Sequence, residues 1–507
     1  MFTTQQTALR TAILFCTILF SCGTSISQQL KKHIHKETLG GIRVKHNPTF
    51  RTTNFMLLTS DGGYIITGNH ASSNTDTTEV IDLKGDLSYY ELNYRQGVWV
   101  RKINKAGQKE WEKIFPGIGA DNGNCIQETI DGGYILAGAK SHYHKQFKSI
   151  GSIDALVIKL SRKGNIEWEK LLGGGSTDFA NYITATNDSG YIFCGNSESS
   201  NGDVKRADKD SGNAWIVKVN KTGSIEWQQL LGYHNTGRAI HIKTLNDGSF
   251  LATGYTSKPM DSSTHEMKDS FISRYGILIF TGHNYGLATK ISANGNIVWE
   301  KLIGDSVSNV ELYDGINTSD NGELLTGTTR LCFKNKINDP NQKVLLAKLD
   351  SLGNTIWQKT WADTGNIHRT ASNIVTSKDG GYVVSGKVTY KYPDTKKYYD
   401  SIEIIDIKGN LVGYDVSVNK EIRYKKIISY DFLAKVDGTG NLIWQKKLEI
   451  NPSFDGNNSL QKTADGNYTF MGNKRSKNKN ISADYLSPYL IKFNDAGTII
   501  WQQELDK

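Results

Sequence analysis

The sequence repeats itself seven times, and this repetition constrains the fold more than any other feature. A motif of the form Asp-Gly-Gly-Tyr, followed by a short apolar stretch and a Gly, recurs along the chain. Its copies begin at Asp61, Asp131, Asp188, Asp247, Asp320, Asp379 and Asp465. A second motif alternates with it and ends on Trp111, Trp168, Trp227, Trp299, Trp357, Trp444 and Trp501. Each unit therefore holds both motifs once.

The second motif keeps fixed offsets from its Trp. A Gly stands four residues before each Trp, at Gly107, Gly164, Gly223, Gly295, Gly353, Gly440 and Gly497. A Lys stands nine residues before it, at Lys102, Lys159, Lys218, Lys290, Lys348, Lys435 and Lys492. Offsets kept through all copies indicate that each unit adopts the same backbone course.

Both motifs predict β-hairpins. In the first, the Asp side chain bonds its own backbone and a Gly supplies the positive φ of a tight turn. In the second, Asn, Ser or Asp begins a type I turn that a left-handed Gly closes. Each unit thus supplies four short strands. These strands are apolar on both faces, as in residues 64–66 and 156–158, so each sheet needs a neighbour on either side.

Four-stranded units that need neighbours on both faces fit radial stacking, which leaves only short sheet edges. We therefore predict an all-β fold, a seven-bladed β-propeller of four-stranded antiparallel blades. It is expected to occupy residues 48–507, after a signal peptide (1–21) and a tether (22–47). The 50 Gly against 7 Pro, with charged residues at only 22%, exclude a charge-driven disordered chain.

The Gly-x-x-x-Trp spacing resembles the quinoprotein-type propeller repeat, in which this strand docks each blade on the next. Together, the DGGY and GxxxW motifs resemble exported propeller repeat proteins common in Bacteroidota. The resemblance covers about Thr49 to Leu505. It implies that the seven Trp pack between blades. An aromatic cage for sugar is the alternative interpretation of these residues.

The seven repeated Lys lie within apolar strands, so each charge must reach solvent or a carboxylate. Asp121, Asp178 and Asp455 each lie ten residues before a DGG-type turn and are the candidate partners. The alternative is a ring of cations around the central channel that attracts an anion.

The N-terminal segment predicts that the chain is exported. The apolar run Ala12 to Phe20 is too short to cross a hydrocarbon core of ~30 Å, and it is typical of a signal peptide. The segment Leu19 to Gly23 resembles a lipobox, which makes Cys22 the lipidated first residue of an outer-membrane lipoprotein. The alternative is cleavage after Ser27, which gives a soluble periplasmic or secreted chain.

Inserts follow the DGGY strand in five units, over residues 69–96, 139–152, 196–213, 255–285 and 387–431. Because they share one position in the repeat, they should lie on one rim of the disc. The segments from Glu79 and Glu403 both predict an added hairpin. Partner-binding candidates in the inserts are Tyr89, Tyr90, Tyr94, Tyr390, Tyr392, Tyr398 and Tyr399. Alternatively, these rings cover small cores of the inserts themselves.

No spacing of Cys, His, Asp or Glu predicts a catalytic, cofactor-binding or metal site. Cys125 and Cys194 are expected to be small buried strand residues. The net charge of +9 is modest for this length, and an exported chain is not expected to meet nucleic acid.

We therefore expect a monomeric, non-enzymatic binding or scaffold propeller of the cell envelope. Its rim inserts would hold a protein or glycan partner, and Cys22 would tether it to the membrane. The alternative is a propeller enzyme, either a glycan hydrolase or lyase or, less favoured, a quinone-dependent dehydrogenase. Clustered acids at the channel mouth would favour catalysis, because a glycosidase needs two carboxylates about 5–10 Å apart.

Overall fold

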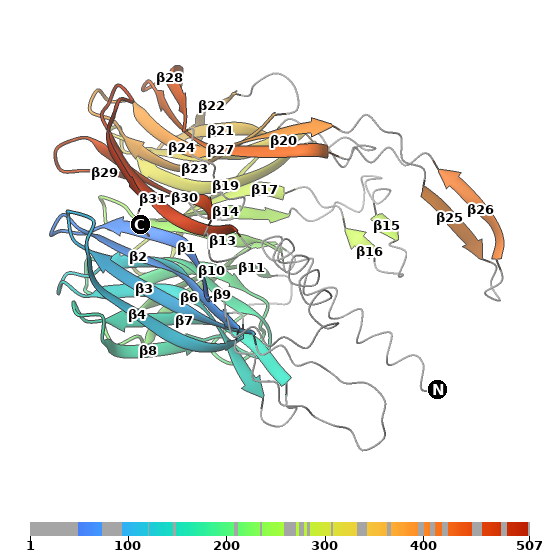
Figure 1. Ribbon diagram of the computed structural model, residues 1–507, viewed down its shortest axis with the longest axis horizontal. Helices are drawn as coiled ribbons and strands as arrows, with labels where there is room; N and C mark the ends of the chain where they lie inside the picture. Colours follow the sequence, from blue (N-terminus) through green and yellow to red (C-terminus); the bar gives the residue numbers. More distant parts are fainter. Residues whose placement is uncertain are drawn as a thin grey trace.

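The computed structural model describes residues 49–73, 94–119, 121–144, 149–206, 211–233, 236–257, 270–272, 278–280, 284–305, 308–331, 342–361, 367–393, 400–405, 411–417, 424–448, 459–477 and 484–504. Within these ranges the chain forms strands and turns and no helix. It therefore contains no described helix that could cross a membrane. Seven four-stranded antiparallel sheets form a seven-bladed β-propeller, as the repeat predicts (Figure 1).

The first four blades take the strands in chain order, with one inserted hairpin in blade 4. Blade 1 is β1 (Thr49–Leu58), β2 (Tyr64–Ser73), β3 (Tyr94–Ile103) and β4 (Lys109–Gly119). Blade 2 is β5 (Asn122–Glu128), β6 (Tyr134–His144), β7 (Ser149–Leu160) and β8 (Ile166–Leu172). Blade 3 is β9 (Asp178–Ala185), β10 (Tyr191–Ser197), β11 (Ser211–Val219) and β12 (Ile225–Tyr233). Blade 4 is β13 (Arg238–Thr244), β14 (Phe250–Ser257), β17 (Asn284–Ile291) and β18 (Ile297–Ile303), with the hairpin β15 (Ser270–Ile272) and β16 (Leu278–Phe280).

The last three blades follow the same order, and blade 6 carries the second inserted hairpin. Blade 5 is β19 (Ser308–Asn317), β20 (Glu323–Leu331), β21 (Lys343–Leu349) and β22 (Thr355–Trp361). Blade 6 is β23 (Ile367–Thr376), β24 (Tyr382–Pro393), β27 (Tyr424–Val436) and β28 (Leu442–Lys447), with β25 (Asp400–Ile405) and β26 (Leu411–Ser417). Blade 7 is β29 (Ser459–Lys462), β30 (Tyr468–Lys477), β31 (Asp484–Phe493) and β32 (Ile499–Glu504).

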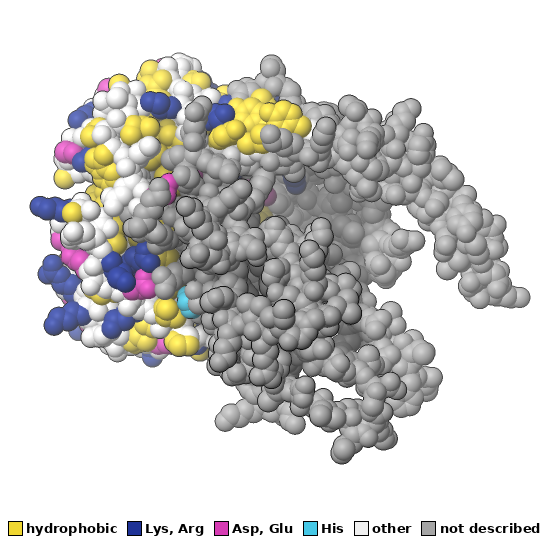
Figure 2. Space-filling model, viewed as in Figure 1, with side chains coloured by type: hydrophobic (Ala, Val, Ile, Leu, Met, Phe, Trp, Pro, Cys, Tyr) yellow, Lys and Arg dark blue, Asp and Glu magenta, His cyan; other side chains and the backbone are white. Residues whose placement is uncertain are grey.

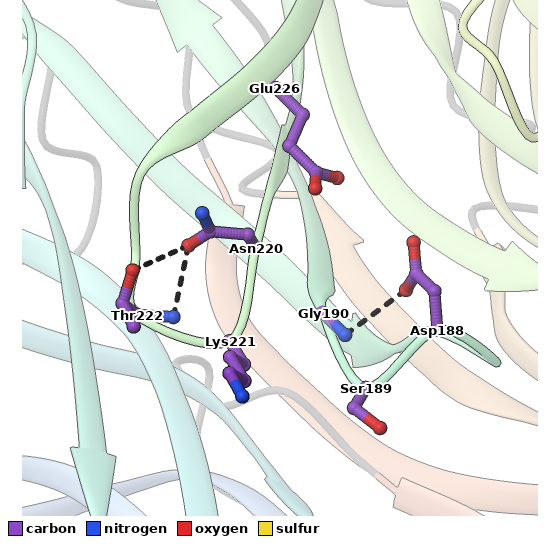
Figure 3. Close-up of a pocket in the computed structure, with 7 residues that line it drawn as sticks. All are labelled: Asp188, Ser189, Gly190, Asn220, Lys221, Thr222 and Glu226. Carbon is purple, nitrogen blue, oxygen red and sulfur yellow. Dashed lines mark hydrogen bonds between the residues drawn. The ribbon is translucent and has the colours of Figure 1, made fainter.

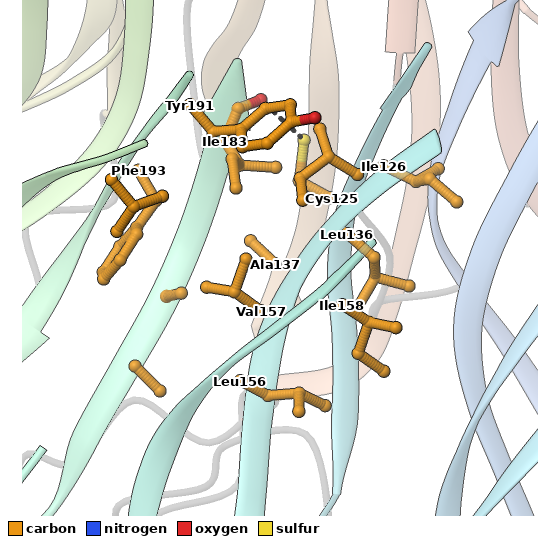
Figure 4. Close-up of a cluster of buried hydrophobic side chains, with 14 of the residues drawn as sticks. Cys125, Ile126, Leu136, Ala137, Leu156, Val157, Ile158, Ile183, Tyr191 and Phe193 are labelled. Carbon is orange, nitrogen blue, oxygen red and sulfur yellow. Dashed lines mark hydrogen bonds between the residues drawn. The ribbon is translucent and has the colours of Figure 1, made fainter. Parts of the chain in front are cut away.

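The first strand of every blade lies at the propeller axis. Strands β1, β5, β9, β13, β19, β23 and β29 each contact the next one in this series, and β29 contacts β1. The fourth strand of each blade is consequently the outer edge. Between blades both faces of each sheet are buried, as Figure 4 shows for Leu136 and Val157 of blade 2 and Phe193 of blade 3.

The turn chemistry expected from the sequence is present. Asp61 Oδ1 accepts hydrogen bonds from the Thr59 hydroxyl (2.6 Å) and the Gly63 amide (2.9 Å), and Gly62 takes φ = 79°. Two copies place a non-glycine residue at this left-handed position, Ser189 at φ = 66° and Asn321 at φ = 61°. All these turns, and those of the second motif, lie on one face of the disc, here called the turn face.

The seven repeated Lys fasten the two hairpins of each blade together. Each Lys stands on the third strand, and its Nζ reaches the Asp of the DGG-type turn in its own blade. The pairs are Lys102–Asp61 (2.9 Å), Lys159–Asp131 (2.9 Å), Lys218–Asp188 (2.8 Å), Lys290–Asp247 (3.2 Å), Lys348–Asp320 (2.9 Å), Lys435–Asp379 (2.7 Å) and Lys492–Asp465 (2.6 Å).

The prediction that these Lys reach a carboxylate is confirmed, but the candidate partners Asp121 and Asp178 and the alternative of a ring around the channel are wrong. Asp121 accepts a hydrogen bond from the Ser141 amide, and Asp178 accepts one from the Ser199 hydroxyl, so both serve other contacts; Asp455 lies outside the described residues. The Lys do not ring the channel, because they stand on the third strand of each blade and not on the first. Spacing along the sequence could not identify the partner of each Lys, because the Asp that it pairs with lies on a neighbouring hairpin of the same sheet.

The repeated Trp join neighbouring blades. A Cβ placed on Gly164 of blade 2 would come within 2.7 Å of the Trp111 ring of blade 1. Trp168 packs in the same way on Gly223 of blade 3, and its indole donates to the Lys221 carbonyl (3.1 Å). The repeated Gly is thus required twice, for its positive φ and for the space that the ring occupies. In six of the seven copies the repeated Gly of the next blade lies against the indole, which argues against an open cage for sugar.

The ring closes without a blade shared between the two ends of the chain. Blade 7 holds β1 through hydrogen bonds from the Ser459 hydroxyl to the Met56 carbonyl (2.8 Å) and from the Asn473 amide to the Thr53 carbonyl (2.9 Å). Trp501 packs beside an apolar cluster that joins Tyr64 of blade 1 to Met471 of blade 7.

Candidate binding site

The inserts join the second and third strands of their blades, and the described ends of these strands lie on the face opposite the turns. The second strand of every blade ends there, the third begins there, and the hairpins β15–β16 and β25–β26 lie beyond these strand ends, to the right in Figure 1. We call this the insert face. The blade strands continue into the ranges expected as inserts, since β24 and β27 stay paired as far as Pro393 and Tyr424. The hairpin predicted from Glu403 is β25–β26, its counterpart from Glu79 lies outside the described residues, and β15–β16 was not predicted.

The structure describes part of the tyrosine set predicted to bind a partner. Tyr390 packs edge to face on Tyr430, with ring centroids 5.9 Å apart, and the Lys447 Nζ lies 3.5 Å from the Tyr430 ring centroid. Tyr390 thus covers its own blade, whereas Tyr392 is 48% exposed. Tyr94 begins β3; Tyr89, Tyr90, Tyr398 and Tyr399 lie outside the described residues, as does Cys22.

A cavity of about 350 Å³ lies on the propeller axis, and all seven first strands contribute to its wall. Its polar lining includes Gln127, Tyr182, His241, Asp314 and Asn373, and Lys243 and Lys462 add two cations. Apolar side chains complete the wall, namely Phe55, Leu57, Leu58, Ile374, Val375 and Leu460. None of the sequence motifs predicted this site.

A signal for the site is nevertheless present in the repeat. The residue six positions before the turn Asp differs in every copy, whereas the positions that build the blades recur. These seven residues are Phe55, Cys125, Tyr182, His241, Asp314, Asn373 and Ser459, and all except Cys125 line the cavity. In blades 1 to 6 a β-bulge directly precedes this residue, as between Thr53 and Phe55, and bulges commonly re-aim the side chain that follows.

The polar residues of the lining form a connected row. The Gln127 amide donates to the Tyr182 hydroxyl (3.0 Å), and the Tyr182 ring lies 4.0 Å from the His241 ring. His241 Nδ1 lies 3.2 Å from Asp314 Oδ1 but makes no hydrogen bond. Asp314 itself accepts from the backbone amides of Gly315 (2.7 Å) and Ile374 (2.9 Å), so it also joins blade 5 to blade 6.

Burial sets the protonation of this row. It lowers the pKa of His241, and the neighbouring Asp314 opposes this shift without reversing it, so the imidazole is neutral at neutral pH. Burial also raises the pKa of Tyr182 well above its usual value and raises that of the Cys125 thiol to about 12. The phenol and thiol therefore keep their protons. Cys125 and Cys194 are buried, as predicted, and both are free thiols.

The described lining of the cavity does not contain the pair of carboxylates that a glycosidase uses. A glycosidase needs two carboxylates about 5–10 Å apart. Among the described residues that line the cavity, Asp314 is the one carboxylate, and both of its oxygens accept backbone amides. The described residues also contain no group of three or more His, Cys, Asp or Glu that could hold a metal ion.

A second hollow lies on the turn face of blade 3, between its two turns (Figure 3). Asp188 and Glu226 in its wall both pair with Lys218, and the Asn220 side chain accepts from the Thr222 amide. These side chains already hold the turns of the repeat. We therefore interpret this hollow as structural.

Comparison with known proteins identifies no family for the chain. No family model matches it, and no curated protein matches it. Similar solved structures include cobalt-substituted Synechocystis ACO, at 12% identity over 80% of this chain and 90% of that chain, with a TM-score of 0.34. Prolyl oligopeptidase B from Galerina marginata has 13% identity over 85% of this chain and 56% of that chain, with a TM-score of 0.32.

A third similar structure is YCF48 bound to D1 peptide, at 8% identity over 69% of this chain and 81% of that chain, with a TM-score of 0.32. Similarity this low does not indicate a shared function. The class of protein is therefore defined by the fold alone: a seven-bladed β-propeller built from one repeated unit.

Proposed function

We propose that this chain is a non-enzymatic binding or scaffold propeller of the cell envelope, which holds a protein or glycan partner on its insert face. One observation carries the proposal, namely the difference between the two faces of the disc. The turn face consists of short repeated turns, whereas the insert face receives every long insertion and both added hairpins. Loops that vary on a rigid repeated scaffold are where binding residues commonly lie.

The partner can be tested by shortening one insert. Residues 394–423 would be replaced by a short Gly-Ser linker, which the pairing of Pro393 with Tyr424 allows. A matched control would replace residues 478–483, which connect β30 to β31 on the same face of blade 7. We expect the wild type to bind a protein partner, detected by cross-linking in the envelope, or a glycan, detected on a glycan array. The first variant should lose this binding, and the control should keep it. Both should unfold at the temperature of the wild type. Unchanged capture, or turnover of a glycan by the wild type, would overturn the proposal.

Two features of the sequence support a cellular location, namely the N-terminal motif and the resemblance to exported Bacteroidota propellers. We propose an outer-membrane lipoprotein anchored at Cys22. Cys22→Ala should then move the protein from the membrane fraction to the soluble fraction. Retention of the variant in membranes would contradict the anchor, and release of the wild type itself would favour cleavage after Ser27.

A further inference from the structure

The axial cavity holds unused hydrogen-bond donors. Within the described part of the chain, the Lys243 ammonium makes no hydrogen bond or ion pair, the Asn373 amide nitrogen donates to no residue, and the Tyr182 hydroxyl accepts without donating. His241 is 8% exposed, and its Nδ1 makes no hydrogen bond although Asp314 Oδ1 lies 3.2 Å away. The Lys243, Asn373 and Tyr182 side chains are partly buried, so their free donors remain accessible to a ligand.

The acceptors of the cavity are mostly occupied. Both Asp314 oxygens accept backbone amides, and Asn373 Oδ1 accepts from the Ser385 hydroxyl (3.2 Å). Gln461 is used at the seam, where it accepts from the Leu58 amide and donates to the Met56 carbonyl. An excess of free donors beside the cations Lys243 and Lys462 therefore suits a ligand that brings acceptors and negative charge.

The apolar part of the cavity wall indicates that the rest of the ligand, beyond its acceptor group, is apolar. Leu57, Val375 and Leu460 line the cavity, and Phe55 packs edge to face on Tyr182 with ring centroids 5.5 Å apart. The large side chains lie on blades 1, 3 and 4 (Phe55, Tyr182, His241), while blades 5 to 7 place the smaller Asp314, Asn373 and Ser459 at the same position. This difference in volume leaves the space. Ligand pockets are commonly apolar with a few polar groups that fix orientation.

We propose that the axial cavity binds a small organic carboxylate with an apolar body. The carboxylate group accepts hydrogen bonds from the Lys243 side chain, with Asn373 and Tyr182 as further donors, and the body packs on Leu57, Val375 and Leu460. This site is independent of the insert face. It is built only from first-strand residues, so the variant that lacks residues 394–423 should keep it.

The test uses octanoate as the probe, with octanamide as the uncharged match and glucuronate as a carboxylate with a polar body. Binding would be measured by calorimetry and by the rise in unfolding temperature of the full chain. We expect octanoate to bind, and octanamide and glucuronate to bind at least about tenfold more weakly, because each lacks one of the two interactions. Equal binding of octanamide, tighter binding of glucuronate, or no binding of octanoate would overturn the proposal.

Two variants locate the site. Lys243→Gln should weaken octanoate binding about tenfold or more, since a hydrogen bond to a charged group is lost. Lys221→Gln removes an exposed cation on the turn face and should leave binding unchanged. Far-ultraviolet circular dichroism and the unfolding temperature would show that both variants fold. Equal octanoate affinity for Lys243→Gln and wild type would place the ligand elsewhere and overturn the assignment.

Discussion

Blades 1 to 3 and blades 4 to 7 share the Lys–Asp pair but differ in the residue directly before the Trp. In blades 1 to 3 it is a Glu that also pairs with the repeated Lys: Lys102–Glu110 (3.4 Å), Lys159–Glu167 (3.2 Å) and Lys218–Glu226 (2.7 Å). In blades 4 to 7 it is an exposed aliphatic residue, namely Val298, Ile356, Ile443 and Ile500.

Two blades of the second group obtain their second acid from the following blade. Lys290 of blade 4 pairs with Glu323 of blade 5 (3.1 Å), and Lys435 of blade 6 pairs with Asp495 of blade 7. Glu323 stands where the other copies have Tyr or Phe, and it is fully buried. The second acid beside the repeated Lys thus comes from the same blade in blades 1 to 3 and from the following blade in blades 4 and 6.

The second turns of the two groups of blades also differ in the sign of their charge. The second turns of blades 1 to 3 carry the exposed cations Lys105, Arg162, Lys163 and Lys221, and Figure 2 shows Lys and Arg along the lower left edge, beside blades 1 and 2. The corresponding turns of blades 4 to 7 carry none. The second turns of blades 5 to 7 carry acids instead, namely Asp350, Asp437 and Asp495, so the same hairpin presents opposite charge in blades 1 to 3 and in blades 5 to 7. The Asp, Lys, Gly and Trp recur in every copy of the repeat, whereas the exposed residues around them vary.

The largest effect should come from removing a Lys whose partner cannot reach water. Lys290→Met leaves the Glu323 carboxylate buried and unpaired, which should cost about 3–5 kcal/mol. Lys218→Met should cost much less, because Asp188 and Glu226 are both more than 40% exposed and can be solvated. Urea unfolding would measure both. In a Lys290→Met background, Glu323→Tyr should recover most of the loss, and equal costs for the two Lys variants would contradict the distinction.

Acid should weaken every blade through its turn Asp. Hydrogen bonds from Thr59 and Gly63 and the pairing with Lys102 outweigh burial and lower the pKa of Asp61 to about 2, and the pKa values of Asp131 and Asp188 are also lowered to about 2. Because these values lie below the unfolded value of 3.8, the stability they contribute is present above about pH 4 and is lost as the pH falls towards 2.

Burial raises the pKa of Glu323, so its contribution has the opposite sign and favours the folded state at low pH. The unfolding temperature should therefore be level between pH 5 and 7 and fall below about pH 4. Asp188→Asn should reduce the slope of that fall. A stability that stays constant down to pH 2 would show that the Lys–Asp pairs contribute nothing.

A smaller effect is expected from exchanging the residue before the Trp between the two halves. Ile356→Glu gives Lys348 a second acid of the kind that Lys218 has, and it should stabilise by less than about 1 kcal/mol because the pair is exposed. The variant should also tolerate more ammonium sulfate before it precipitates, since an exposed aliphatic side chain is removed. The reverse change, Glu226→Ile, should lower both the unfolding temperature and the solubility.

The smallest effect should come from the turns that lack the usual Gly. Ser189→Gly relieves a left-handed Ser and should raise the stability by up to about 1 kcal/mol, while Asn321→Gly should gain less because Asn tolerates this region better. Gly62→Ser is the reverse control and should destabilise. Thermal unfolding of the three variants would check the order, and a loss of stability in Ser189→Gly would contradict it.

Much of the architecture could be predicted because it depends on neighbours in the sequence. The Asp and Gly of each turn act within a few residues, and the alternation of motifs sets four strands in each unit. The partners of the repeated Lys could not be predicted, since Lys218 meets Asp188 only after two hairpins pair. The pairing of Lys290 with Glu323 of the next blade could be seen only in the structure, because it depends on how the blades stack.

The sequence by itself determined that seven like units would form, each with two hairpins, a Gly turn and a Trp for its neighbour, because repeated local geometry specifies these features. Only the tertiary structure decided which residues meet on the axis. Tyr182, His241 and Asp314 come from successive units and lie together because closing the ring brings the first strands to a common centre. Contacts between distant units depend on that closure, which no single repeat contains.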